Sequence, residues 1–114
     1  MTVRKVFPVR PLLLALAAGA LVLPASVAPA APRVHTVVMD KMKFGPVPAR
    51  LRSGDTIVWV NRDMFKHTAT ARDKSFNVDL PPKASRKTVI KGSGTIAFYC
   101  VYHPGMKGTL NFAK

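Results

Sequence analysis

The only cysteine of the chain, Cys100, opens a seven-residue segment that ends at Met106 and carries His103 between them. The segment presents a thiolate, an imidazole and a thioether at three-residue intervals. A second imidazole, His67, follows the apolar run at residues 57–60. Two histidines, one cysteine and a weak axial methionine form the trigonal site of electron-transfer copper centres. These residue types and their spacing therefore predict a site for one copper ion.

Each of these residues has a simpler explanation when it is taken alone. A lone cysteine is more often a small buried apolar residue, a lone histidine a surface residue, and a lone methionine a filler of the core. The combination at this spacing favours the metal site. The remaining histidine and three further methionines lack ligand spacing, and we expect them in strands, core or loops: His35, Met39, Met42 and Met64.

Residues 1–30 have the composition of a secretory signal peptide. Three cationic residues precede an apolar stretch at residues 12–23, and a run of small residues with an Ala28-Pro29-Ala30 cleavage pattern follows. The apolar stretch is shorter than the roughly 20 residues that a membrane-spanning helix needs. We therefore expect export to the periplasm, no integral membrane span in the mature chain, and one domain at residues 31–114.

A free thiol in an exported protein needs a reason, because the exported compartment is oxidising and one cysteine cannot form an internal disulfide. Metal ligation by Cys100 supplies that reason. A metal that binds only the folded state also stabilises it, so the loaded form should melt at a higher temperature than the metal-free form.

The mature segment carries 15 Lys and Arg residues against five Asp, a formal charge of +10 with histidine neutral. Such a charge can indicate nucleic-acid binding, but export argues against a nucleic acid as partner. Most of these charges keep a small protein soluble. Lys66 and Lys107, however, adjoin His67 and Met106 and would surround the site. We predict that these two lysines attract a redox protein with an acidic docking surface. We also expect the chain to be a monomer.

Between residues 34 and 114 the sequence shows short apolar alternations, turn signals and many β-branched residues, without a helical period. This pattern predicts an all-β fold, a two-sheet Greek-key β-sandwich. We expect seven strands, at Val34–Met39, Ala49–Arg52, Thr56–Asn61, Thr68–Arg72, Ser85–Lys91, Thr95–Cys100 and Gly108–Phe112.

Side-chain alternation predicts where the cysteine points. Ile96, Phe98 and Cys100 share one face of their strand, so the thiol should point inward at the end of the sheet. The segment from Cys100 to Met106 then forms a loop at one pole of the sandwich. Pro104 in this loop has no N–H to donate towards the thiolate, which should leave the sulfur electron-rich.

These motifs resemble the cupredoxins, the small blue copper proteins, and within that family the amicyanin-like members. The resemblance covers the mature chain. It is carried by Phe44-Gly45-Pro46, by the stretch from Gly54 to Asn61 with Trp59 in it, and by the short Cys-x-x-His-x-x-Met loop at 100–106. Members of the family with longer ligand loops match this spacing less well. The resemblance implies the cupredoxin-like sandwich and a type 1 copper site.

The resemblance also implies a role for each site residue. His67, Cys100 and His103 would be the equatorial ligands and Met106 the long axial one. Asn61 would lie behind the ligands and tie the two ligand-bearing loops together. Lys66 and Tyr102 stand where amicyanins commonly have proline. Together with Lys107, they would form a docking surface that differs from the one in amicyanins.

Three classes of function follow, and the first is favoured. The chain would be an exported carrier of single electrons, because protein ligands fill all the strong positions on the metal and leave none for a substrate. The alternative is a periplasmic copper-binding protein for resistance or delivery. A metal-free secreted sandwich is the third. We predict that the chain is not an enzyme: a copper nitrite reductase needs a second domain and a second copper site, and a thiol protease needs an orienting acid.

Overall fold

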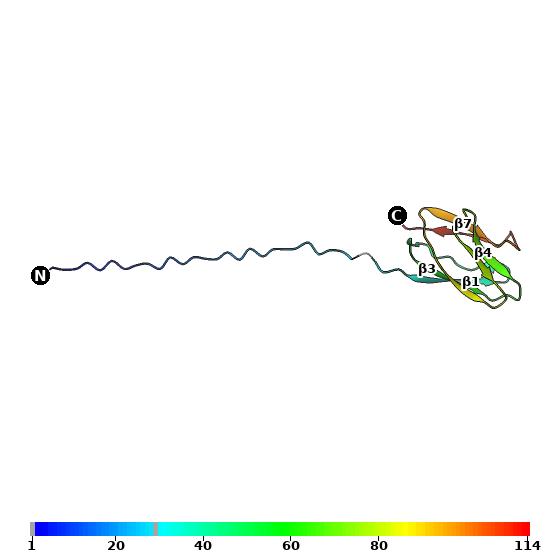
Figure 1. The fold of residues 1–114 in the computed structure, drawn as a ribbon, viewed down its shortest axis with the longest axis horizontal. Helices are drawn as coiled ribbons and strands as arrows, with labels where there is room; N and C mark the ends of the chain where they lie inside the picture. The colour runs from blue at the N-terminus through cyan, green and yellow to red at the C-terminus, as the bar shows by residue number, and fades with distance from the viewer. Residues whose placement is uncertain (1, 29) are drawn as a thin grey trace.

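The folded body of the chain lies between residues 31 and 114. The structure is a computed structural model that describes residues 2–28 and 30–114. Residues 2–28 form neither helix nor strand and extend away from the folded body (Figure 1). Within the described residues no helix is long and apolar enough to cross a membrane. Met1 and Pro29, which belong to the predicted signal peptide, lie outside the described residues.

Eight strands form two four-stranded sheets. The first sheet has the order β2-β1-β3-β6 and the second the order β5-β4-β7-β8. The strands are β1 (Val34–Asp40), β2 (Lys43–Phe44), β3 (Thr56–Asn61), β4 (His67–Ala71), β5 (Asn77–Leu80), β6 (Ser85–Val89), β7 (Thr95–Tyr99) and β8 (Lys107–Asn111). β1 and β3 pair in parallel, and the other neighbours are antiparallel. The predicted two-sheet all-β sandwich is confirmed.

The predicted strand at Ala49–Arg52 is wrong. Only Leu51 pairs there, through an isolated bridge to Phe112, and two prolines just before it cannot donate to a ladder. The short strands β2 and β5 were not predicted. In β5 a single residue, Leu80, is fully buried, so the apolar alternation that identifies a strand is almost absent.

The core is built around two aromatic rings from facing sheets. Trp59 on β3 and Phe98 on β7 are fully buried, and their ring centres lie 5.3 Å apart in an edge-to-face arrangement. Phe44 on β2 packs edge-on against Phe98 at 4.8 Å. The alternation that buries Ile96 and Phe98 continues to Cys100, which is also fully buried. The packing of the core therefore fixes the position of the end of β7, which Cys100 follows.

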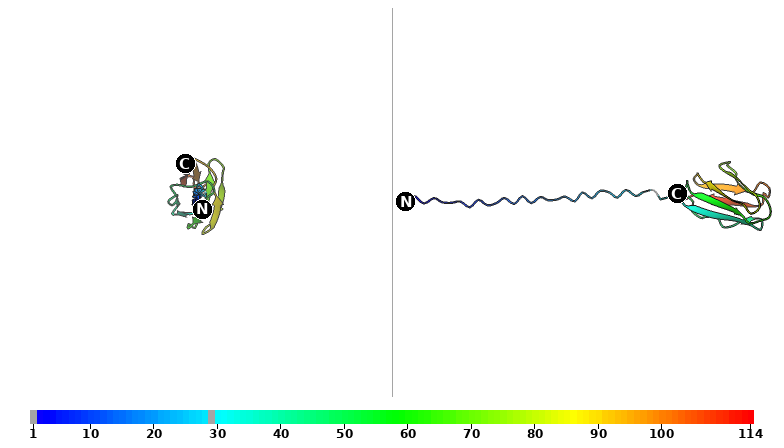
Figure 2. Two further views of the ribbon diagram at one scale, coloured as in Figure 1. Left: turned by 90° about the vertical axis from the view of Figure 1, so that its left-hand side faces the viewer. Right: turned by 60° about the horizontal axis from the view of Figure 1, so that its bottom comes forward.

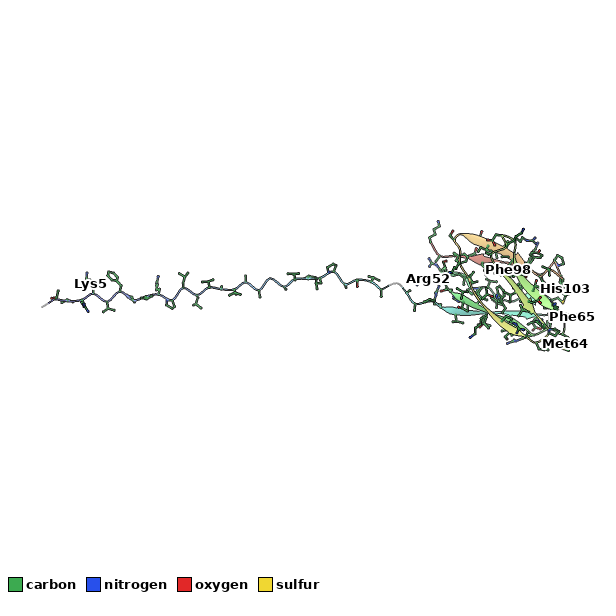
Figure 3. All side chains as sticks on the ribbon, in the orientation of Figure 1. Lys5, Arg52, Met64, Phe65, Phe98 and His103 are labelled. Carbon is green, nitrogen blue, oxygen red and sulfur yellow. The ribbon has the colours of Figure 1, made fainter. Side chains whose placement is uncertain are left out.

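The two poles of the sandwich differ in what they carry. The N-terminal segment leaves from the end that also holds the C-terminus, as both side views show (Figures 1 and 2). Arg52 lies at that end, whereas His103, Phe65 and Met64 lie at the opposite end (Figure 3). The candidate ligands are thus gathered at the pole farther from the N-terminal segment.

A buried carboxylate closes the pole near the N-terminal segment. Asp55 is 1% exposed, and it accepts hydrogen bonds from the backbone N–H groups of Arg33 (2.9 Å) and Arg52 (3.0 Å). His35 Nε2 lies 3.0 Å from its Oδ2. Burial alone would raise the pKa of Asp55, but these partners and the Arg33 charge outweigh it and hold the pKa well below its usual range. His35 is a strand residue, as expected, and it contributes to this network.

We predict that Asp55→Asn destabilises the fold in a pH-dependent way. Hydrogen bonds to a charged group contribute about 1.5–3 kcal/mol, so the variant should lose about 2 kcal/mol at pH 7. Because the folded-state pKa is lowered, the contribution is present above the unfolded-state pKa of 3.8 and is lost as the pH falls further. Urea unfolding of both proteins at pH 7 and pH 3 measures this. The exposed Asp40→Asn is the control, and an equal difference at both pH values would contradict the prediction.

Gly108, near the start of β8, packs tightly against the core. A Cβ at this position would meet the ring of Phe98 well inside van der Waals contact. We predict that Gly108→Ala costs about 1–3 kcal/mol of folding free energy, because the fully buried ring cannot move aside. At Gly105, three residues earlier in the chain, an added Cβ meets nothing within 4 Å. Thermal unfolding should therefore leave Gly105→Ala within about 0.5 kcal/mol of the parent.

Candidate metal centre

Three predicted ligands from two segments of the chain meet at one pole. His67 is the first residue of β4, and Cys100 follows the last residue of β7; both are fully buried. His103 lies in the turn after Cys100 and is half-buried. Their ligand atoms all lie within 4.8 Å of one another. The Cys100 Sγ atom is 3.8 Å from His67 Nδ1 and 3.7 Å from His103 Nδ1, and the two Nδ1 atoms are 3.2 Å apart.

These separations fit one metal ion. First-row ions such as zinc bind imidazole nitrogen at about 2.0 Å and thiolate at about 2.3 Å. Three such donors at about 120° around one ion would be roughly 3.5–3.8 Å apart. The observed triangle is close to this size, so the donors need little movement to bind. One thiolate and two imidazoles are a donor set that copper accepts in both of its oxidation states.

Met106 lies in the same loop as two of the ligands. It is 4% exposed, and backbone hydrogen bonds close the loop on both sides of it: Cys100 N–H donates to Met106 O (3.0 Å), and Met106 N–H donates to His103 O (2.8 Å). Pro104 is exposed in the turn between them. The short loop thus brings the thioether-bearing residue back beside the cysteine. Its role as axial ligand remains a prediction.

Thr68 joins the two ligand-bearing segments, and the sequence did not reveal this. Its backbone N–H donates to Cys100 Sγ at 3.3 Å, and its hydroxyl oxygen accepts from the Val101 N–H at 3.0 Å. The Cys100 sulfur therefore accepts one backbone hydrogen bond from the neighbouring strand, whereas Pro104 has no N–H to donate. A small hydroxyl residue directly after a histidine ligand is too common for its spacing to have indicated this role.

Asn61 is fully buried behind the loop that precedes His67. Its side-chain amide donates to the carbonyl groups of Phe65 (2.7 Å), Leu80 (3.0 Å) and Pro81 (3.2 Å). These bonds tie the loop that precedes His67 to the end of β5. Thr68 bonds the first ligand segment to Cys100 and Val101, and His67 Nδ1 also lies within reach of Cys100 Sγ and His103 Nδ1.

Asp63 contacts the predicted ligand His67 directly, and it was not identified from the sequence. Its Oδ2 lies 2.8 Å from His67 Nε2; because an ionised carboxylate only accepts hydrogen bonds, Nε2 carries the proton. Burial alone would raise the pKa of Asp63, but the bonds from His67, Met42 and Lys41 lower it below its usual value. Metal-binding histidines usually bond a carboxylate or carbonyl through their second nitrogen. That rule, applied to an aspartate four residues before His67, could have found it.

Apolar and cationic side chains surround His103. Met64 and Phe65 are 72% and 59% exposed, and they lie at the same end of the molecule as His103 (Figure 3), with the Phe65 ring 6.3 Å from the imidazole. Tyr102 is half-exposed, with Lys66 Nζ 5.2 Å from its ring centre. Lys66 also lies 3.5 Å from Asp79. Lys107, at the start of β8, is exposed.

The fold and the site together define a small β-sandwich protein with a cluster of donor side chains suited to copper. The chain belongs to the family of cupredoxin-like domains, whose model matches residues 12–111. This confirms the resemblance drawn from the sequence motifs. A search of the curated proteins found no match.

Solved structures with the same fold include amicyanins. Amicyanin from Paracoccus versutus (Thiobacillus versutus) is 22% identical, with a TM-score of 0.57 over 75% of this chain and 85% of that one. A purple cupredoxin from Nitrosopumilus maritimus is 19% identical, with a TM-score of 0.60 over 69% of this chain and 99% of the other. A copper-containing nitrite reductase from Thermus scotoductus is 24% identical, with a TM-score of 0.61, and the match covers 81% of this chain and 24% of that enzyme. At these identities the likeness concerns the fold.

We predict that Cys100→Ser folds but loses the copper site, because serine supplies no soft thiolate. The parent should gain an intense blue band with copper and, at 100 times the Kd, about 2.7 kcal/mol of stability, equivalent to a rise in Tm on the order of 10 °C. The variant should show neither. His35→Gln at the other pole is the control and should keep both. A blue band that survives in Cys100→Ser would exclude this ligand assignment.

Proposed function

We propose that the chain is an exported mononuclear type 1 copper protein that carries single electrons between redox partners. The observation that carries the proposal is the triangle of His67, Cys100 and His103 at the spacing of one metal ion. A bound copper ion would supply the one-electron Cu(I)/Cu(II) couple. The protein residues hold both states in one geometry, since the ligand loops are fixed by hydrogen bonds through Thr68 and Met106.

The burial of the ligands supports electron transfer in preference to substrate turnover. His67 and Cys100 are fully buried, and only His103 approaches the surface. The ring of Phe65 lies 6.3 Å from that of His103, edge to face. A partner that covers this rim would reach the centre through one imidazole, while water stays away from the thiolate. This arrangement suits a carrier, and we propose no enzymatic activity.

The surface around His103 suits docking to another redox protein. An apolar centre formed by Met64, Phe65 and Tyr102 would exclude water, and Lys66 and Lys107 at its edge would attract an acidic partner. We propose that a monomer docks in this way and that nucleic acid is not a partner. Residues 1–30 would direct export to the periplasm and be removed, leaving the sandwich at 31–114 as the mature protein.

Copper resistance or delivery is the second candidate. A hollow of about 370 Å³ beside the ligand loop is lined by Met42, Met106, Lys43, Phe44, Gly105 and Lys107. Thioethers favour Cu(I), so a hollow lined by two methionines is the feature that favours copper exchange with another protein. The lysines on its rim oppose the entry of a free cation.

Voltammetry of the copper-loaded protein and of Met106→Gln tests the proposal. The parent should give a reversible one-electron wave. The variant should stay blue with a lower midpoint potential, because an oxygen donor favours Cu(II) over Cu(I) more than a thioether does. An irreversible wave in the parent would favour copper handling, and an unchanged potential in the variant would mean that Met106 is not a ligand.

A further inference from the structure

The carboxylate of Asp63 is placed to influence the metal centre through His67. Its Oδ2 accepts a hydrogen bond from His67 Nε2–H at 2.8 Å, and the side chains of Asp63 and His67 are 11% and 0% exposed. Within the described residues this is the one carboxylate that hydrogen-bonds a predicted ligand. We propose that Asp63 is a positioning residue that lowers the reduction potential of the copper centre through His67. The inference rests on the proposed electron-carrier function.

The hydrogen bond first fixes which nitrogen faces the metal. Because Nε2 of His67 carries the proton for Asp63, Nδ1 keeps a free lone pair. That Nδ1 atom is the one that lies 3.8 Å from Cys100 Sγ and 3.2 Å from His103 Nδ1. Asp63 therefore holds the ring with its donor atom turned into the ligand triangle, independently of any metal.

The carboxylate itself cannot turn away from the ring. Its Oδ1 accepts from the Lys41 N–H at 2.7 Å, its Oδ2 also accepts from the Met42 N–H at 3.0 Å, and its own backbone N–H donates to Asn61 Oδ1 at 2.9 Å. Lys41 and Met42 have φ values of 52° and 62°, which non-glycine residues rarely adopt. Asp63 stabilises this turn between β1 and β2, so the same group anchors a strained turn and a ligand.

The charge on Asp63 then acts on the equilibrium between the two copper states. A carboxylate partner makes a histidine ligand more basic, and a nearby negative charge in a partly dehydrated place favours the ion of higher positive charge. Both effects favour Cu(II) over Cu(I). The surrounding lysines, such as Lys66, are largely solvated, so salt screens their opposing effect more strongly.

Asp63→Asn is the direct test, because asparagine keeps the size of the side chain and an acceptor for the turn but removes the charge. Partners of this kind change metal affinity by about 10-fold to 100-fold. We expect the affinity for Cu(II) relative to Cu(I) to fall about tenfold, an upward shift of about 59 mV in a one-electron couple. The blue band should remain, since the ligand atoms are unchanged. Asp79→Asn is the matched control: it removes the same charge at the same pole, from a side chain that is 67% exposed and contacts Lys66 rather than a ligand.

The outcome separates this inference from the proposed function. A higher potential in Asp63→Asn with little change in Asp79→Asn supports the role of Asp63. Equal shifts in the two variants, or a lower potential in Asp63→Asn, would overturn it while the reversible wave of the parent still stands. Absence of that wave in the parent would instead remove the carrier function. If Asp63→Asn does not fold, Asp63→Ser, which removes the charge with a smaller polar side chain, decides by the same comparison.

Discussion

The antiparallel register between β4 and β7 is the constraint on which the site depends. Thr70 pairs with Tyr99 and Ala71 with Phe98, and the same register brings Thr68 to Val101, where the hydroxyl accepts the Val101 N–H. His67 and Cys100 therefore emerge from neighbouring strands at one end of the sheet. A slip of one residue would turn the thiol to the outer face, and the ligands could no longer converge. The buried rings of Trp59 and Phe98 hold the register, because they require the present inward set of side chains.

Polar groups behind the ligands extend this constraint to the loops. Asn61 ties the loop before His67 to the end of β5, and Asp63 ties His67 to the turn between β1 and β2. Thr68 completes the set at the thiolate. These groups are buried or nearly so, and water therefore competes little with their hydrogen bonds. The ligand positions are thus determined by the protein, which is the condition for a centre that changes charge without changing shape.

The sequence was informative where chemistry depends on residue type and period. Cys100, His103 and Met106 share a short segment, so their proximity follows from spacing alone, and the alternation of Ile96, Phe98 and Cys100 gave the direction of the thiol. The sequence was less informative where structure depends on contacts between distant segments. Leu51 looked like part of a strand but forms one bridge to Phe112, and β5 has too few apolar residues to be recognised.

The residues behind the ligands show the same limit. Asn61 was expected to join the ligand loops, and its observed bonds hold the loop before His67. The bonds of Thr68 to Cys100 and Val101 were not expected, because a backbone N–H carries no signature in the side-chain pattern. The place of Asp63 four residues before His67 could have indicated it as a partner, but the turn at Lys41 that holds its carboxylate is visible only in the fold. A motif identifies donors by type, whereas the hydrogen bonds that orient them depend on the fold.

Titration of the mature protein with Cu(II), followed by visible and electron paramagnetic resonance spectra through one cycle of ascorbate reduction and reoxidation, tests the central claim most directly. The trigonal site of His67, Cys100 and His103 predicts an end point at one copper per chain and an intense blue species with narrow hyperfine splitting that bleaches and returns. A pale tetragonal signal, or no stoichiometric binding, would contradict it.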